Sequence, residues 1–214
     1  MNKFSGTGVA LITPFNNDKS IDFNSLEKLV EFVINGGVDF LVVLGTTAET
    51  TSLNDKEQND VINCIKKTNN SRLPMILGIG GNNTSNVLEK IISTDLSFFE
   101  AILSVTPYYN KPTQEGLYQH YKAISSVSPI PIILYNVPSR TSVNLSAETT
   151  LRLANDFSNI VAIKEASGDL DQIKNILQNK LHSVSLVSWW HEAANEESPS
   201  PSLPTPQLQI QLQS

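Results

Sequence analysis

A lysine stands at the end of an apolar segment of strand-like composition. Lys164 directly follows residues 160–163 (IVAI). Burial in a strand removes water from the ammonium group and favours the neutral amine, which can attack a ketone and form a Schiff base. The alternative is a strand-end lysine that extends to solvent or pairs with Glu165, because most lysines are exposed. From the residues alone, both interpretations stay open.

A tyrosine occupies the equivalent place one repeat earlier. Tyr135 lies 29 residues before Lys164 and also ends an apolar run. Equivalent positions on neighbouring strands would bring both side chains into one pocket. A phenol in that pocket can relay protons during imine formation. The alternative is a core tyrosine whose hydroxyl is satisfied by a structural hydrogen bond.

Two further segments could bind carboxylates. Gly45-Thr46-Thr47 offers a glycine turn, backbone N–H groups and two hydroxyls just before a helix, which suits a carboxylate. Threonine-rich turns more often only cap a helix. Arg140 follows Pro138, so its guanidinium sits on a stiffened loop from which it could bind a second carboxylate. A surface arginine is the alternative there.

The remaining polar residues do not predict a metal or cofactor. His120, His182 and His191 are scattered and lack metal-ligand spacing. The glycine-rich segment at residues 78–81 (GIGG) follows a strand but lacks the full dinucleotide-binding spacing. Cys64 lies in a helical pattern, where packing is the more common role. We therefore expect no bound metal and no organic cofactor.

Short apolar runs precede these candidate residues and recur every 27–35 residues. The runs are continuously apolar, which is typical of parallel strands covered on both faces. They are GVALITP from Gly8, DFLVVLG from Asp39, PMILGIG from Pro74, AILSVTP from Ala101, PIILYNV from Pro131 and IVAIKEA from Ile160.

Helical patterns lie between the runs. Residues 26–33 form an apolar stripe with Asp22 or Asn24 as start and Gly36-Gly37 as end. Residues 54–57 (NDKE) resemble a capping box. Residues 114–125, 147–155 and 170–178 are also predicted helices. Strand–helix alternation predicts βα units in a parallel sheet, either a closed (β/α)₈ barrel or an open doubly wound sheet. A complete barrel usually needs about 250 residues.

Composition narrows the class of protein. The 214 residues carry 15 Lys and Arg against 21 Asp and Glu, a net charge of −6, which argues against a nucleic-acid-binding face. The longest apolar run has five residues, far short of a membrane span. With one cysteine, no internal disulfide can form. We expect a soluble cytoplasmic protein.

The C-terminal part departs from the repeat. Ser183 to Val187 could start a seventh strand, but both tryptophans follow at Trp189-Trp190. Residues 198–214 hold no charged side chain and four prolines, a composition typical of an unstructured tail. We therefore divide the chain into a partial barrel at residues 1–182 and an atypical, disordered tail at residues 183–214.

Four motifs in order resemble the dihydrodipicolinate synthase family of lysine biosynthesis. The likeness runs from Phe4 to Asn179. Each motif is modest alone, but four in order at matching spacing are specific. They are Gly45-Thr46-Thr47-x-Glu49, Thr106-Pro107-Tyr108-Tyr109-Asn110-Lys111-Pro112, Tyr135-Asn136-Val137-Pro138-Ser139-Arg140-Thr141 and Ile163-Lys164-Glu165-Ala166-Ser167-Gly168.

The resemblance implies a (β/α)₈ TIM barrel, here truncated to about six βα units plus the tail, and a metal-free class I aldol mechanism. Pyruvate would form a Schiff base with Lys164, and its enamine would attack aspartate semialdehyde. Tyr135 would relay protons with Thr46. Tyr109 would complete the relay, reaching across from a neighbouring subunit of a homodimer or homotetramer.

The same resemblance assigns the substrate carboxylates. Thr46 and Thr47 would hold the carboxylate of pyruvate, and Arg140 that of the semialdehyde. Sialate lyases share the lysine and the tyrosine but usually lack the Pro-Ser-Arg-Thr segment, so Arg140 favours the synthase. A sialate-lyase relative remains an alternative, as does an inactive truncated fragment of the synthase.

Two departures from the family pattern bear on activity. Ala48 stands where the family usually has glycine. The family also continues through strands seven and eight, whereas this chain continues into Trp189 and the polar tail. We hypothesise a frame-shifted or wrongly spliced reading that begins between residues 180 and 198. Without strand eight the sheet would keep two open edges, which predicts poor solubility and little activity.

Overall fold

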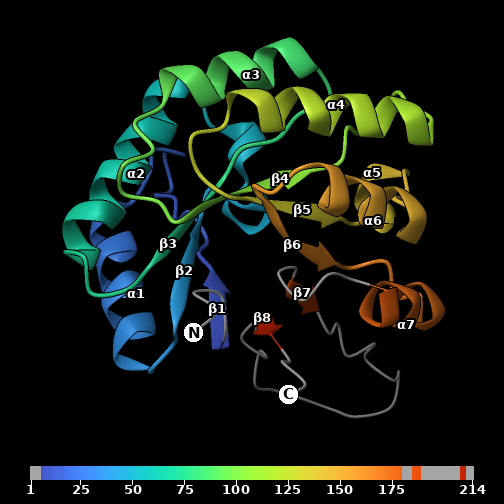
Figure 1. Ribbon diagram of the computed structural model, residues 1–214. Coiled ribbons are helices and arrows are strands. Elements are labelled where there is room, and N and C mark those ends of the chain that lie inside the picture. Colours follow the sequence, from blue (N-terminus) through green and yellow to red (C-terminus); the bar gives the residue numbers. More distant parts are fainter. Residues whose placement is uncertain (1–5, 180–184, 189–207, 211–214) are drawn as a thin grey trace, which may run out of the picture.

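The sheet is the centre of the molecule, and the helices lie outside it (Figure 1). A computed structural model describes residues 6–179, 185–188 and 208–210. Eight strands close into a barrel in chain order, β1 to β8. Pairing is parallel from β1 through β7, and β8 is antiparallel to both of its neighbours. The predicted parallel βα sheet is confirmed, and its closure settles the choice between a barrel and an open sheet.

Each of the six predicted apolar runs holds all or most of one strand, β1 to β6. The strands are β1 (Gly6–Ala10), β2 (Phe40–Val43), β3 (Met75–Gly78), β4 (Ala101–Val105), β5 (Ile132–Asn136), β6 (Ile160–Glu165), β7 (Ser185–Ser188) and β8 (Leu208–Ile210). The helices are α1 (Phe23–Asn35), α2 (Asp55–Asn69), α3 (Thr84–Ser93), α4 (Gln114–Val127), α5 (Pro138–Thr141), α6 (Ala147–Asp156) and α7 (Leu170–Asn179). Two 3₁₀ turns, η1 (Thr46–Ala48) and η2 (Thr50–Ser52), join β2 to α2. None of the helices in the described ranges is long and apolar enough to cross a membrane.

The helices begin where short polar side chains can cap them. Asp22 accepts a hydrogen bond from the backbone N–H of Ser25 at the start of α1. At α2, Asn54 and Glu57 bond to each other's backbone N–H groups, which confirms the predicted capping box. Each such cap is worth about 1 kcal/mol and sets where the helix begins. The caps thus fix which residues are left to connect strand to helix at the carboxyl ends of the strands.

Apolar side chains form two layers, one on each face of the sheet. The inner layer fills the barrel and includes Ala10, Phe40, Ile133 and Ala162. The outer layer packs the other strand face against the helices. Because successive strand residues point to opposite faces, a residue's parity along its strand decides which layer it joins. Tyr135 belongs to the inner layer, whereas Leu134 and Ile163 belong to the outer one.

The last two strands correct one expectation. The predicted seventh strand is present as β7, paired in parallel with β6. The prediction of two open sheet edges is wrong, because β8 bridges β1 and β7. A short antiparallel segment can satisfy the backbone hydrogen-bonding groups at the edge of a sheet. The proposed change of reading frame and most of the predicted tail lie outside the described residues.

A buried histidine joins α3 to α4. His120 is 4% exposed, and its Nδ1 lies 2.8 Å from Thr84 Oγ1. Its ring meets Tyr121 edge to face, with centroids 5.2 Å apart. Burial lowers the pKa of His120 from 6.5 to about 4, because the imidazolium would lose its hydration there. Folding therefore favours the neutral ring.

This burial predicts a loss of stability in acid. Between pH 6.5 and about 4 the unfolded chain protonates His120 and the folded chain does not, so stability falls as the pH is lowered through that window. The loss at pH 4.5 should be roughly 2–3 kcal/mol. Urea unfolding at pH 7.5 and 4.5 measures it. His120→Asn, which can keep the bond to Thr84, should show a loss smaller by that amount. Equal losses in both proteins would contradict the assignment.

Candidate active site

Lys164 and Tyr135 are direct partners in the sheet. The register of β5 and β6 sets Tyr135 opposite Lys164 and Asn136 opposite Glu165. The Lys164 Nζ lies over the Tyr135 ring, 4.3 Å from its centroid. The spacing of 29 residues predicts neighbouring positions on adjacent strands, and the pairing confirms that part of the prediction. An amine and a phenol thus meet inside the barrel.

Burial shifts the Lys164 amine towards its neutral form. Its side chain is 5% exposed. The pKa of Lys164 is lowered from 10.5 to about 7. Loss of hydration is the larger cause, and the positive charge of Arg140 is the smaller one. The solvent-exposed interpretation of this lysine is therefore wrong. At neutral pH a large fraction of the amine carries a free electron pair.

The Tyr135 hydroxyl is hydrogen-bonded to a threonine in the loop after β2. Burial raises the pKa of Tyr135, whereas a hydrogen bond with the Thr46 side chain and the positive charge of Arg140 lower it. Thr46 begins η1, in the loop that follows β2. The bond therefore connects the loop after β2 with the end of β5. Such a hydrogen-bonded pair of hydroxyls can pass a proton between them.

A cavity of about 700 Å³ opens at the carboxyl ends of β2 to β5. This is the end of a parallel barrel where active sites form. Thr46, Tyr135 and Arg140 are on its wall. Lys164 is not on that wall, and its amine contacts the Tyr135 ring that is. The amine is thus one side chain removed from the open space.

A glycine lets the cavity wall close behind β2. A Cβ at Gly78 would collide with the carbonyl oxygen of Leu44. Both residues are on the cavity wall, at the ends of β3 and β2. Close backbone approach, rather than nucleotide binding, is therefore the role that we find for this glycine.

The two threonines after Gly45 have different places. Thr46 is on the cavity wall, whereas Thr47 is half-buried and is not among the residues that line the cavity. Ala48 is buried in the right-handed turn η1, and its carbonyl oxygen accepts a 2.8 Å hydrogen bond from Thr13 Oγ1. The positive φ of this segment falls on Leu44 and Glu49 instead. Alanine therefore fits the place where glycine is usual in the family.

Arg140 comes from a single helical turn. Pro138 begins α5. The Thr141 hydroxyl donates a hydrogen bond to the Val137 carbonyl oxygen at 3.1 Å, which closes the turn. The Arg140 side chain is exposed at the cavity, while its charge acts on both Lys164 and Tyr135. A guanidinium on a cavity wall can bind a carboxylate through two parallel, bidentate hydrogen bonds.

Tyr109 lies away from this cluster within the chain. It is 84% exposed and adopts a positive φ of 74°. A bulky residue in that conformation is strained and needs a reason to stay there. The structure thus brings together Lys164, Tyr135, Thr46 and Arg140, and it leaves Tyr109 on the surface.

Polar residues behind the cluster escaped the sequence analysis. Asn136 and Gln172 were not singled out, and Glu165 was considered only as an ion-pair partner of Lys164. Asn136 donates to both carboxylate oxygens of Glu165, at 3.1 and 3.0 Å. The pair has the same 29-residue spacing as Tyr135 and Lys164, and that spacing was the signal that could have revealed it.

The described part of the chain offers no cluster of metal ligands. No group of three or more His, Cys, Asp or Glu residues there could hold an ion. His182 and His191 lie outside the described residues. Cys64 is partly buried against the core, and that burial raises the pKa of its thiol.

A family model described as the dihydrodipicolinate synthetase family matches residues 3–195. Among curated relatives, 4-hydroxy-tetrahydrodipicolinate synthase from Flavobacterium psychrophilum is 55% identical over 188 residues, covering 88% of this chain and 64% of the relative. The synthase from Parabacteroides distasonis is 51% identical and covers 86% of this chain and 62% of the relative. The chain thus spans somewhat less than two thirds of the length of these relatives.

Solved structures agree with the sequence relatives. Dihydrodipicolinate synthase from Thermotoga maritima superposes with a TM-score of 0.83 at 40% identity, covering 87% of this chain and 64% of that one. The chloride-inhibited synthase from Acinetobacter baumannii, complexed with pyruvate, gives a TM-score of 0.82 at 46% identity, covering 86% of this chain and 63% of that one.

The lowered pKa of Lys164 predicts its reactivity. Acylation by acetic anhydride at graded pH, read by peptide mass mapping, should give a midpoint near pH 7 for Lys164. Arg140→Gln removes a positive charge, so the midpoint should rise by about one unit or less. It should stay below 10.5, because burial is the larger cause. Arg152→Gln, on the surface of α6, should leave the midpoint in place. An ordinary lysine midpoint in the unaltered protein would refute the buried amine.

Proposed function

The chain belongs to the dihydrodipicolinate synthetase family, and on that premise we propose that it acts as a cytoplasmic 4-hydroxy-tetrahydrodipicolinate synthase. Its reaction would be the aldol condensation of pyruvate with L-aspartate 4-semialdehyde. One observation carries the proposal: a buried amine with a pKa of about 7 lies against a tyrosine at the cavity wall. Neutral amines of this kind form Schiff bases with ketones.

The proposed chemistry begins at the Lys164 amine. Its electron pair attacks the pyruvate carbonyl carbon, and loss of water leaves an imine. Loss of a proton from the pyruvate methyl group gives an enamine, whose carbon attacks the aldehyde of the semialdehyde. The new alkoxide takes a proton, and the free amino group of the product then displaces Lys164 as the ring closes. Lys164 thus returns unchanged.

Tyr135 and Thr46 would move the protons of these steps. The Tyr135 ring lies against the amine, and its hydroxyl would protonate the departing oxygen as water. The hydrogen bond with Thr46 offers a route for a replacement proton. The expected third member is Tyr109. Tyr109 is 84% exposed, so its side chain is accessible to the cavity of a second copy, as a homodimer or homotetramer would require.

Two groups would bind the substrate carboxylates. The turn at Thr46 and Thr47 would hold the carboxylate of pyruvate, with Thr46 as the nearer residue, since only Thr46 is on the cavity wall. Arg140 would bind the carboxylate of the semialdehyde at the cavity mouth. The two carboxylates would thereby orient the ketone and the aldehyde toward each other.

Borohydride trapping tests the proposed Schiff base. Incubation with pyruvate and borohydride should add one reduced pyruvyl group to Lys164, located by intact mass and peptide mapping. The trapping rate should rise with pH through about 7 as the amine loses its proton. Lys164→Met should abolish the adduct, and Tyr135→Phe should slow its formation about 10²–10⁴-fold. Lys174→Met, an exposed control on α7, should trap normally.

Two outcomes would separate the alternatives. A full-length relative treated in parallel shows that the trapping chemistry works. If the relative is labelled and this chain is not, the chain is an inactive fragment. If this chain is labelled but adding the semialdehyde yields no product, pyruvate binding survives without the condensation, and the proposed activity is wrong.

A further inference from the structure

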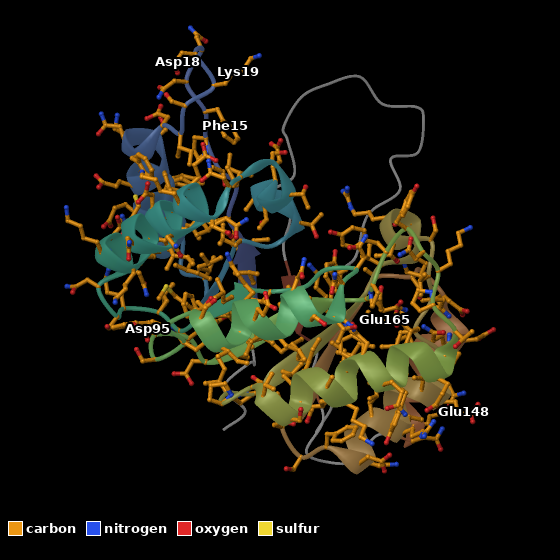
Figure 2. The ribbon with its side chains drawn as sticks, turned by 90° about the horizontal axis from the view of Figure 1, so that it is seen from above. Phe15, Asp18, Lys19, Asp95, Glu148 and Glu165 are labelled. Atoms are coloured by element: carbon orange, nitrogen blue, oxygen red, sulfur yellow. The ribbon has the colours of Figure 1, made fainter. Side chains whose placement is uncertain are left out.

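A carboxylate is buried directly behind the Lys164–Tyr135 pair. Glu165 is 1% exposed and follows Lys164 on β6. Successive strand residues point to opposite faces, so Lys164 joins the barrel interior and Glu165 the layer between sheet and helices. Figure 2 shows Glu165 within the body of the molecule and Glu148 at its edge. The position of Glu165 thus depends on the same backbone that carries the reactive amine.

Uncharged donors surround this carboxylate. Asn136 Nδ2 lies 3.1 and 3.0 Å from its two oxygens. The Ser167 backbone N–H donates to Oε1 at 2.8 Å, and Gln172 Nε2 donates to Oε2 at 3.0 Å. A buried carboxylate is costly unless it accepts hydrogen bonds of this kind. Glu165 therefore joins β5, β6 and α7 at one point.

Asn136 extends the network to the loop that carries Arg140. The loop leaves β5 at Asn136 and returns at Leu145, whose N–H donates to Asn136 Oδ1 at 2.9 Å. Asn136 Nδ2 also donates to Asn144 Oδ1 at 2.8 Å. Gln172 donates to Asn144 Oδ1 at 3.2 Å and to the Leu145 carbonyl oxygen at 3.2 Å. Both ends of the loop are thus tied to the residues that bind Glu165.

We propose that Glu165 is a positioning residue that fixes Arg140 relative to Lys164. Lys164 is on β6, and the Glu165 carboxylate binds this strand to Asn136 and Gln172. These two residues hold the ends of residues 137–144, the segment that carries Arg140. The inference rests on the proposed function, in which Lys164 forms the Schiff base and Arg140 binds a substrate carboxylate. It adds a residue that touches no substrate and sets the distance between the amine and the guanidinium.

The network requires an acceptor at both oxygens of residue 165. Asn136 Nδ2, Ser167 N and Gln172 Nε2 all donate to it. Glutamine has nearly the same shape as glutamate but would direct its own N–H₂ group at one of these donors. Glu165→Gln therefore removes a hydrogen bond and adds a donor–donor contact without changing the packing volume.

A charge-exchanged double variant provides a partial rescue. In Asn136→Asp with Glu165→Gln, the amide at 165 can donate to the carboxylate at 136 and its carbonyl oxygen can accept from Gln172, while the amide still faces the Ser167 N–H. The Leu145 N–H keeps an acceptor at residue 136. Glu148→Gln is the matched control, because Glu148 is exposed on α6. It makes the same chemical change on an exposed side chain outside the Glu165 network.

The test measures the pH midpoint of Lys164 acylation and the rate of pyruvate trapping, both well below the unfolding temperature of each variant. Glu165→Gln should raise the acylation midpoint by no more than Arg140→Gln does, about one pH unit, and slow trapping at pH 7 up to about fivefold. Glu148→Gln should match the unaltered protein, and the double variant should recover part of the loss. A purely structural residue would lower the unfolding temperature and leave the midpoint in place, which would overturn the proposal.

The remaining outcomes are also decisive. If the unaltered protein traps no pyruvate, the proposed function fails, while the acylation midpoint still tests Glu165. If Glu165→Gln does not fold, Gln172→Leu replaces it, because it removes one donor and leaves the carboxylate intact. A smaller shift in the same direction would then support the positioning role. An unchanged midpoint in Gln172→Leu would refute it.

Discussion

The register between β5 and β6 is the constraint on which the site depends. It sets Tyr135 opposite Lys164 on one face and Asn136 opposite Glu165 on the other. A shift of β6 by one residue would turn its side chains over, placing the carboxylate in the barrel and the amine among the helices. The apolar residues that precede each pair prevent that shift, because they would have to exchange layers as well. Packing therefore specifies the chemistry.

Burial gives the amine its reactivity, and it also costs the protonated amine its hydration. A lysine that loses hydration is held partly neutral, and a nearby guanidinium adds to the effect. The aromatic face of Tyr135 offsets part of that cost for the protonated form. The same phenol is hydrogen-bonded to the Thr46 side chain, so one contact joins the loop after β2 to β5, the strand beside the amine. Stability and reactivity draw on the same few contacts.

The sheet closes although the chain is shorter than its relatives. The chain spans somewhat less than two thirds of its relatives, yet β8 completes the ring between β1 and β7. Its antiparallel direction differs from that of the other seven strands. Lys164 pairs with Val187 of β7, so the strand that carries the amine has a neighbour on both sides. An amine at an open edge would be hydrated, and its pKa would be ordinary.

Local patterns in the sequence determined the strands, the capped helices and the importance of Lys164 and Tyr135, because periodicity, caps and the 29-residue spacing act over one repeat or less. They predicted Arg140 and Thr46 as candidates, and the structure brings both to the cavity. Only the tertiary structure decided that Thr47 stays off the cavity wall, that Glu165 faces Asn136 and Gln172 rather than solvent, and that β8 runs antiparallel. These depend on contacts between segments distant in the chain, whose geometry no local pattern specifies.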